Sequence, residues 1–460
     1  MLFSSISFFF FFLVYFSLNY FLKANQKIYL IIFGSMIFYS FWYPYYFWVP
    51  ILLTLVGFYG AQILENSKNR SALFLIICLV LIAPLIIFKY YDFIITKVLL
   101  LPSSFALDLN LPLGISFISF TMIAYIVETF RKDYPIERNL KSMFAYVLFF
   151  PQLIAGPIIR PAQLLPRLNN IKEKFSQSYF QLGLFIFFIG LLKKLIFADQ
   201  VGFYVDNSYS NFQGLKSLDA LLTSYAFSVQ IYCDFSGYTD MAIGLGMMLG
   251  IRLPINFNRP YIATSISDFW RRWHITLSTW LRDYLYIPMG GSKFGKLLTL
   301  RNLIITMFLG GIWHGAGWNF IVWGVIHGIT LAAYHLFFSK KPKKLDSKFS
   351  RALKVFFMFN FISLTWIFFR SPDIDTAITI IGSFSNFRDL SLEAFFNDNI
   401  FYIILIVIFL FSHKFDTLGR LRLFHIKSNV FGRILFYLAI VSLIIAFGSS
   451  SSEKFIYYDF

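Results

Sequence analysis

The chain has 460 residues, of which 58% are hydrophobic, 21% aromatic and only 14% charged. A soluble domain could not cover that much apolar surface, so the composition excludes a water-soluble globular protein and predicts an integral membrane protein. The formal net charge is +17, but Lys and Arg stand in short connections between apolar runs, where cytoplasmic retention and anionic membrane lipids account for them. We therefore expect no nucleic-acid partner.

The N-terminal segment and the two cysteines say little about function. The N-terminus has an apolar core without a basic region before it or a small-residue cleavage site, which predicts an uncleaved first span. Cys78 and Cys233 both lie in apolar runs. They argue against a disulfide framework.

Apolar runs follow one another along nearly the whole chain. They cover residues 7–22, 28–42, 47–64, 72–88, 111–130, 142–159, 180–198, 219–250 (with a break allowed), 302–313, 317–338, 355–369, 399–412 and 432–448. Because a full span needs about 20 residues, these runs predict roughly ten to thirteen membrane segments. Several are short or interrupted by Gly and Pro, which membranes tolerate where broken helices are buried in protein or line a cavity.

These runs predict a single membrane domain over residues 1–460. We expect N-terminal helices over 1–105, a catalytic core over 106–338, and a cytoplasmic basic loop with C-terminal helices over 339–460. By the positive-inside rule the basic connections are cytoplasmic, which places the N-terminus on the outer side. Those connections hold Lys23 and Lys27, Lys68 and Arg70, residues 339–354 and residues 414–433.

Chemistry-bearing residues gather between residues 231 and 328. In the first block, residues 232–250, Asp234 and Asp240 are carboxylates within an apolar run. One interpretation is structural pairing with an Arg or a hydroxyl between helices, and the other is substrate binding. Four glycines in the same block would permit close helix packing.

The second block, residues 265–291, predicts a basic amphipathic helix. Ser265 and Asp268 form a possible capping box. A helical projection places an aromatic and apolar face beside a polar stripe of Arg271, His274, Ser278 and Arg282. Such a helix could anchor in lipid headgroups. Alternatively, its guanidiniums could hold the phosphates of a large anionic substrate with His274 near the reacting end.

The third block reads GGIWHGAGWN over residues 310–319 and places His314 among glycines. An ionisable side chain at membrane depth is costly and marks a functional site by default. An imidazole suits removal of a proton from a hydroxyl or thiol. The alternative is a histidine satisfied by a backbone carbonyl, which is the interpretation we favour for His327 and His335.

The sequence lacks the motifs of several other classes of enzyme. The sequence contains no HExxH, no Cys pair at zinc spacing, no Walker loop, no GxSxG and no HxxxxD. We therefore expect no metal and no bound cofactor. Cys233 could in principle accept an acyl group, but no base adjoins it in the sequence.

Five motifs together resemble the membrane-bound O-acyltransferase family, and within it the bacterial AlgI- and PatA-like branch of alginate and peptidoglycan O-acetylation proteins. A D-alanyl transfer protein is a more distant relative. The motifs occur in family order between about residues 110 and 370, and they are long and specific. They are FFPQLIAGPIIRP (149–161), YCDFSGYTDMAIGLG (232–246), the stretch 256–291, GGIWHGAGWNFIVWGVIHG (310–328) and WIFFR (366–370).

The resemblance implies an all-α ring of about 10–13 membrane helices around a thinned centre with a transmembrane tunnel. It matches His314 to the family's near-invariant histidine and His274 to its second polar position. Acetyl-CoA would serve as co-substrate from the cytoplasmic side of a bacterial inner membrane. The acetyl group would reach its acceptor at the outer face through a periplasmic partner, expected to be an SGNH-type acetyltransferase.

The expected reaction is O-acetylation of a cell-envelope polysaccharide. Peptidoglycan is favoured because the residue usage indicates an AT-rich genome, with alginate or another exopolysaccharide as the alternative. In this hypothesis His314 is the general base and His274 orients the thioester or assists, while Arg271 and Arg282 contact CoA phosphates. Ser278, Asp234, Trp313 and Asn319 complete the candidate substrate-binding set. The rival class is a transporter of an acylated or glycan precursor, which would release no CoA.

Overall fold

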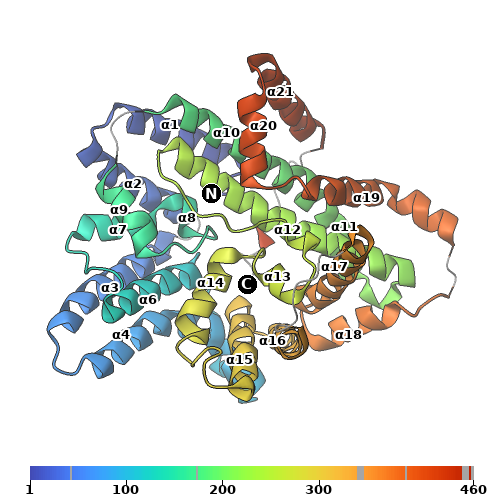
Figure 1. The fold of residues 1–460 in the computed structure, drawn as a ribbon, viewed down its shortest axis with the longest axis horizontal. Helices are drawn as coiled ribbons and strands as arrows, with labels where there is room; N and C mark the ends of the chain where they lie inside the picture. The colour runs from blue at the N-terminus through green and yellow to red at the C-terminus, as the bar shows by residue number, and fades with distance from the viewer. Residues whose placement is uncertain (42–43, 172–174, 339–346, 389–390, 448–454, 457–460) are drawn as a thin grey trace. The chain divides into compact units, whose positions relative to one another are not determined.

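The computed structural model describes residues 1–41, 44–171, 175–338, 347–388, 391–447 and 455–456, and every regular element in them is a helix (Figure 1). The all-α class is therefore confirmed. The chain divides into two compact units, one of residues 1–187 with 238–254 and one of residues 188–237 with 255–460.

Eight helices of the described residues are long and apolar enough to cross a membrane, which establishes a multi-pass membrane protein. Two shorter apolar helices, α1 (Ile6–Phe21) and α18 (Ile374–Ser383), accompany them. The eight cover Pro44–Asn66, Arg70–Val98, Gln177–Ser210, Lys296–His314, Trp318–Phe338, Lys348–Arg370, Leu392–His413 and Val430–Phe447.

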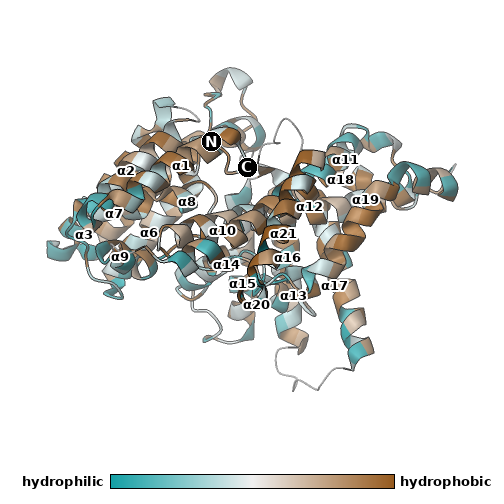
Figure 2. Cartoon of the chain, turned by 90° about the horizontal axis from the view of Figure 1, so that it is seen from above, coloured by the Kyte–Doolittle hydropathy of each residue, from teal (hydrophilic) through white to brown (hydrophobic). Residues whose placement is uncertain are grey.

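Outward-facing apolar side chains distinguish the last two spans from core helices of a soluble protein. Only 6% of the apolar window in α21 (Val430–Phe447) and 17% of that in α19 (Leu392–His413) is buried. Figure 2 shows hydrophobic residues, in brown, along α19. A helix that is apolar all round and still exposed needs lipid as its surroundings.

The first unit holds the N-terminal helices, among them the buried helix α6 (Ile115–Arg131). Every residue from Ile115 to Thr129 of α6 is buried, so the predicted run 111–130 forms an internal helix. Its remaining α-helices are α2 (Ala24–Ser40), α3 (Trp48–Asn66), α4 (Arg70–Leu85), α5 (Tyr91–Phe93), α7 (Leu140–Leu148), α8 (Phe150–Leu153) and α9 (Pro161–Asn169), with most of α10 (Gln177–Leu192) and the end of α12 (Ser217–Met248).

Two predicted runs differ from the observed helices. Run 142–159 is no continuous span, because α7 ends at Leu148, α8 ends at Leu153 and no helix follows until α9 begins at Pro161. Pro151 and Pro157 lack the N–H groups that a helix interior uses. Run 219–250, for which a break was allowed, instead forms the uninterrupted 32-residue helix α12.

The second unit contains the helices that carry the chemistry-bearing motifs. In it α15 (Lys296–His314) packs along α16 (Trp318–Phe338), and α16 packs against α17 (Lys348–Arg370) and α13 (Ile266–Trp270). The unit also contains α11 (Asp199–Ser210), α14 (Ile275–Leu281), α18, α19, α20 (Leu418–Lys427) and α21, together with the end of α10 and α12 as far as Gly237. Of the predicted basic loop, residues 339–346 lie outside the described part of the chain.

Candidate functional site

The predicted amphipathic helix over residues 265–291 is wrong as one helix. The chain instead forms α13, then the short α14, then a π-helical turn over Arg282–Tyr286. His274 stands at the break with a φ of 41°, in the left-handed region that a non-glycine residue rarely adopts. Backbone strain of this kind concentrates at functional sites.

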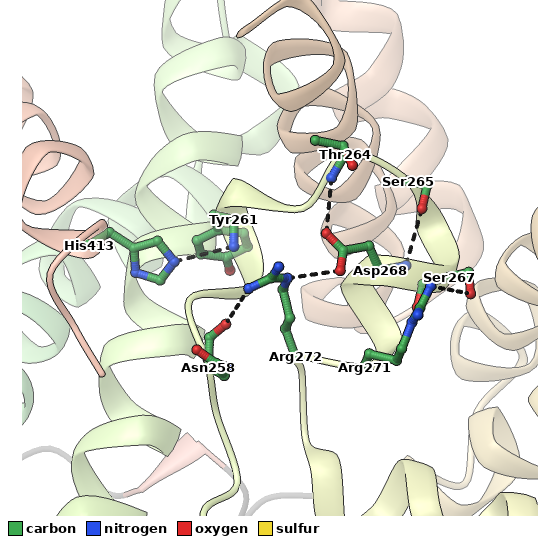
Figure 3. A network of polar contacts seen from close by, with 9 residues as sticks. All are labelled: Asn258, Tyr261, Thr264, Ser265, Ser267, Asp268, Arg271, Arg272 and His413. Atoms are coloured by element: carbon green, nitrogen blue, oxygen red, sulfur yellow. Dashed lines mark hydrogen bonds and ion pairs between the residues drawn. The ribbon is translucent and has the colours of Figure 1, made fainter. Parts of the chain in front are cut away.

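An extended segment, residues 256–258, causes the break by taking the backbone groups that a continuous helix would use. The Ile275 N–H donates to the Asn256 carbonyl at 2.9 Å, and the Asn258 N–H donates to the Arg272 carbonyl at 2.9 Å. The Arg272 side chain adds a bond to the Asn258 carbonyl (Figure 3). Buried backbone groups must find such partners, so this pairing fixes the turn at His274.

The hydrogen bonds around His274 settle which ring nitrogen carries its proton. The Thr276 backbone N–H can only donate, and it donates to the Asn256 side chain at 3.1 Å, so that atom is Oδ1. His274 Nδ1 lies 3.1 Å from the same oxygen and therefore donates to it. The proton is on Nδ1, which leaves a lone pair on Nε2.

That lone pair is available for chemistry. His274 is completely buried, and its Nε2 has no hydrogen-bond partner among the described residues. Burial lowers the pKa of His274 to about 3, so the ring is neutral at physiological pH. Most buried acceptors in folded proteins have a partner, so His274 Nε2 stands out as a buried acceptor with its lone pair unused among the described residues.

His314 ends α15 and lies in an aromatic pocket. The residue is 3% exposed. The centroid of its ring lies 5.1 Å from that of Trp323 and 5.2 Å from that of Phe369. α16 can bring Trp323 this close because Gly311 lies against Gly324, and a Cβ on Gly311 would stand 3.0 Å from the Gly324 Cα. The glycines thus set the distance between the two helices, as small residues do in membrane bundles.

Trp313 links the two histidines. Its ring centroid is 6.1 Å from that of His274 and 5.0 Å from that of His314. Both histidines and the indole are buried in the same unit. The structure thus brings together three of the residues that the sequence marks: His274, Trp313 and His314.

The predicted stripe of arginines beside His274 does not exist, because it depended on the continuous helix. Arg271 is exposed and hydrogen-bonds to the carbonyl and hydroxyl of Ser267 (Figure 3). Arg282 has a side chain 58% exposed and pairs with Asp283 at 2.6 Å. Ser278 donates to the Trp273 carbonyl. Their roles toward a substrate remain predictions.

Asp234 lies in a buried charge cluster. Lys194 Nζ is 2.8 Å from Asp199 and 2.9 Å from Asp234, and all three residues are at most 4% exposed. Burial of charges is tolerated when they are paired in this way. This geometry is the structural pairing that was one of the two interpretations of Asp234, with a lysine as partner.

Asn319 and His327 support the aromatic pocket. The Asn319 amide donates to the Phe368 and Ser371 carbonyls at the end of α17, next to Phe369. Trp270 Nε1 donates to His327 Nδ1, and His327 Nε2 consequently donates to the Thr365 hydroxyl at 3.1 Å. Both ring nitrogens of His327 are thus used inside the protein, as expected for a structural histidine.

Sequence reasoning missed two contributors to this region. Asn256 orients His274 but stands 18 residues before it. Phe455, 1% exposed, places its ring 5.9 Å from Phe235, whose ring is 4.7 Å from His274. The Ile456 N–H donates to Asp234 Oδ2 at 2.7 Å. The only signal for this contact was an aromatic residue following a polar run near the C-terminal end.

Known proteins resemble the chain over most of its length. The model of the membrane-bound O-acyltransferase family matches residues 117–370. A peptidoglycan O-acetyltransferase of Helicobacter pylori is 38% identical over 415 residues, which cover 83% of this chain and 78% of the relative. A probable alginate O-acetylase of Azotobacter vinelandii is 38% identical over 412 residues, covering 85% and 80%.

A third relative is more distant. A teichoic acid D-alanyltransferase of Bacillus subtilis is 31% identical over 273 residues, which cover 56% of this chain and 68% of the relative. The family match includes both His274 and His314. The chain therefore belongs to the membrane-bound O-acyltransferase family, in the bacterial branch of the two O-acetylating relatives, and is a membrane-bound acyltransferase.

Proposed function

We propose that this enzyme transfers an acetyl group from acetyl-CoA toward a hydroxyl of a cell-envelope polysaccharide, with peptidoglycan as the favoured acceptor. The names of the two O-acetylating relatives support the proposal that the group is acetyl and that the acceptor is a polymer of the cell envelope. Alginate or another exopolysaccharide is the alternative acceptor. The observation that carries the chemistry is the pair of buried histidines, His274 and His314, in contact with one indole.

In the proposed reaction His314 is the general base. It takes the proton of the acceptor hydroxyl while the oxygen attacks the thioester carbonyl carbon. The resulting tetrahedral intermediate collapses with cleavage of the carbon–sulfur bond, and the proton held by His314 passes to the CoA thiolate. The acetyl ester and free CoA are the products, and neither a metal nor another cofactor takes part in this scheme.

The proton position on His274 narrows how this residue assists. Because Nδ1–H is bound to Asn256, the neutral ring offers only the Nε2 lone pair to a substrate. His274 would therefore accept a hydrogen bond from the acceptor hydroxyl, and it would not donate one to the thioester carbonyl oxygen. Arg271 and Arg282 remain the proposed contacts to CoA phosphates.

The route across the membrane is part of the same proposal. Acetyl-CoA would enter from the cytoplasm, and the acceptor at the outer face of the bacterial inner membrane would be served by a periplasmic SGNH-type acetyltransferase. The multi-pass architecture, with eight candidate spans, supports a protein that connects the two sides.

Transfer of the acetyl group from labelled acetyl-CoA by the purified protein, supplied with an acceptor that carries a hydroxyl group, tests the assignment. His314→Gln should lower the rate of CoA release by at least about a hundredfold, the usual contribution of a general base. His335→Gln, a histidine of α16 outside the aromatic pocket, is the matched control and should retain the wild-type rate. Near-normal release by the His314 variant would overturn the base assignment, and absence of release by the wild type would favour a transporter.

The acceptor needs a separate experiment in cells. Deleting the gene should remove the O-acetyl groups that mass spectrometry detects on peptidoglycan fragments. Restoring the wild-type gene should bring these groups back, and restoring His314→Gln should not. An unchanged peptidoglycan combined with a deacetylated exopolysaccharide would show that the alternative acceptor is the right one.

A further inference from the structure

We propose that a groove between the start of α17 and the end of α19 binds the phosphate headgroup of one anionic phospholipid, with an acyl chain along its apolar wall. The groove has a volume of about 540 Å³ and lies within the second unit. It is lined by Tyr261, Ile262, Lys348, Arg351, Ala352, Val355, Phe356, Phe359, Leu410 and His413.

The polar end of the groove carries excess positive charge. Lys348 and Arg351 line it directly. Arg259 and Arg420 both donate to the Lys414 carbonyl, at 3.1 and 2.7 Å, so their guanidiniums are held close together. Burial, followed by the charges of Arg420, Arg272 and Arg351, lowers the pKa of Arg259. Cations gathered like this are relieved by an anion.

Nearby carboxylates are already used by other partners. Asp416 pairs with Lys193 at 2.6 Å and accepts from the Tyr232 hydroxyl. Asp268 pairs with Arg272 at 3.0 Å (Figure 3). Among the described residues Arg351 and Lys348 have no acidic partner. The positive end of the groove is thus left for an external anion.

Buried N–H donors point to the same kind of ligand. The Tyr261 backbone N–H donates to His413 Nε2 at 3.2 Å, so the proton of this ring is on Nδ1 (Figure 3). His413 is 2% exposed, lines the groove, and its Nδ1 has no partner in the part of the chain that the structure describes. Arg259 Nε is likewise buried without a partner there. A phosphate or ester oxygen would satisfy such donors.

The apolar wall identifies a lipid as the occupant. Phe356 is 57% exposed, and Leu410 is 39% exposed on the facing helix. Both α17 and α19 are candidate membrane spans, and Lys348 and His413 stand at their basic ends. Positive charge at the end of an apolar groove between two spans complements an anionic headgroup with its acyl chain. A free phosphate would leave the apolar wall uncovered.

Native mass spectrometry of the detergent-purified protein provides the test. The probes are phosphatidylglycerol and phosphatidylcholine with identical acyl chains. Lys348→Gln with Arg351→Gln removes the two charges that line the groove, and Ala352→Trp places a bulky side chain in the groove from an exposed position. The matched control is Arg422→Gln with Lys427→Gln, which removes two exposed charges of α20 that do not line the groove.

The proposal expects one phosphatidylglycerol retained in preference to phosphatidylcholine. Binding should weaken roughly tenfold or more in both groove variants and stay unchanged in the control. Equal retention of the two lipids, or equal phosphatidylglycerol binding by wild type and Ala352→Trp, would overturn it. Displacement of the lipid by free CoA would also overturn it, since the groove would then be a site for CoA phosphates.

Discussion

Single side chains decide the chemistry available to the two histidines. Asn256 Oδ1 accepts three hydrogen bonds, from His274 Nδ1, the Thr276 N–H and the Thr276 hydroxyl. The sequence marks His274 and His314 by their residue type at membrane depth. The partner that fixes the His274 proton could not be found, because a hydrogen bond across 18 residues leaves no periodic pattern.

Replacing Asn256 tests this orientation. Asn256→Ala should destabilise the protein by about 1–3 kcal/mol, because it leaves buried donors unsatisfied. It should also lower acetyl transfer by at least about tenfold, because the His274 proton is no longer held on Nδ1. Thermal unfolding and CoA release measure the two effects.

Asn256→Asp separates an effect on the protonation of His274 from an effect on the stability of the protein. The carboxylate keeps the acceptors but favours the charged imidazolium, so it should raise the pKa of His274 from its burial-lowered value of about 3. If catalysis needs the neutral ring, the acid limb of the rate profile must move to higher pH. A profile identical to that of the wild type would show that His274 does not act through its lone pair.

The buried charges around Lys194 give a second prediction for single residues. Lys194→Met should lower the free energy of unfolding by about 3–5 kcal/mol, since Asp199 and Asp234 would remain as uncompensated buried carboxylates. Adding Asp199→Asn and Asp234→Asn should recover most of that loss in a thermal unfolding assay. No recovery in the triple variant would mean that Asp234 has a role other than pairing.

Individual helices were predicted where they are long and apolar, and mispredicted where remote backbone interrupts them. The expected runs at 302–313 and 317–338 became α15 and α16 with modest changes of boundary. The helix over 265–291 was wrong, because residues 256–258 supply backbone partners that periodicity within the helix cannot reveal.

Two adjacent glycines of α15 provide a matched pair for a prediction about helix packing. A Cβ on Gly311 would collide with the Phe320 carbonyl and the Gly324 Cα, whereas a Cβ on Gly310 would meet only the end of the Leu281 side chain, at 3.2 Å. Gly311→Ala should therefore push α16 away, disturb the Trp323 contact of His314, and lower both stability and acetyl transfer.

Gly310→Ala should leave acetyl transfer within about a factor of two, since a flexible side chain yields at little cost and Ala favours the helix. Thermal unfolding and CoA release by the two variants side by side measure the difference. Equal losses in both would show that helix spacing is not what the glycines determine.

At the scale of the whole molecule, composition alone identified a multi-pass helical membrane protein, and the motif series identified its family. The division into two compact units was not predicted, because the units are not continuous in sequence: residues 238–254 belong with the N-terminal part. The candidate site falls in the second unit, which collects its residues from the segment 256–258 and from the stretch between α13 and α17.

The orientation of the second unit in the membrane gives the last prediction. α19 is a candidate span, with exposed Glu393 in its first turn and the basic helix α20 after its end. The positive-inside rule places α20 in the cytoplasm and Glu393 outside. Glu393→Cys and Lys427→Cys are introduced singly after Cys78 and Cys233 have been replaced by Ser. A membrane-impermeant maleimide should label Glu393→Cys in intact spheroplasts, and Lys427→Cys only after permeabilisation. The reverse pattern would contradict the orientation that the positive-inside rule gives, and would place the basic helix α20 at the outer face of the membrane.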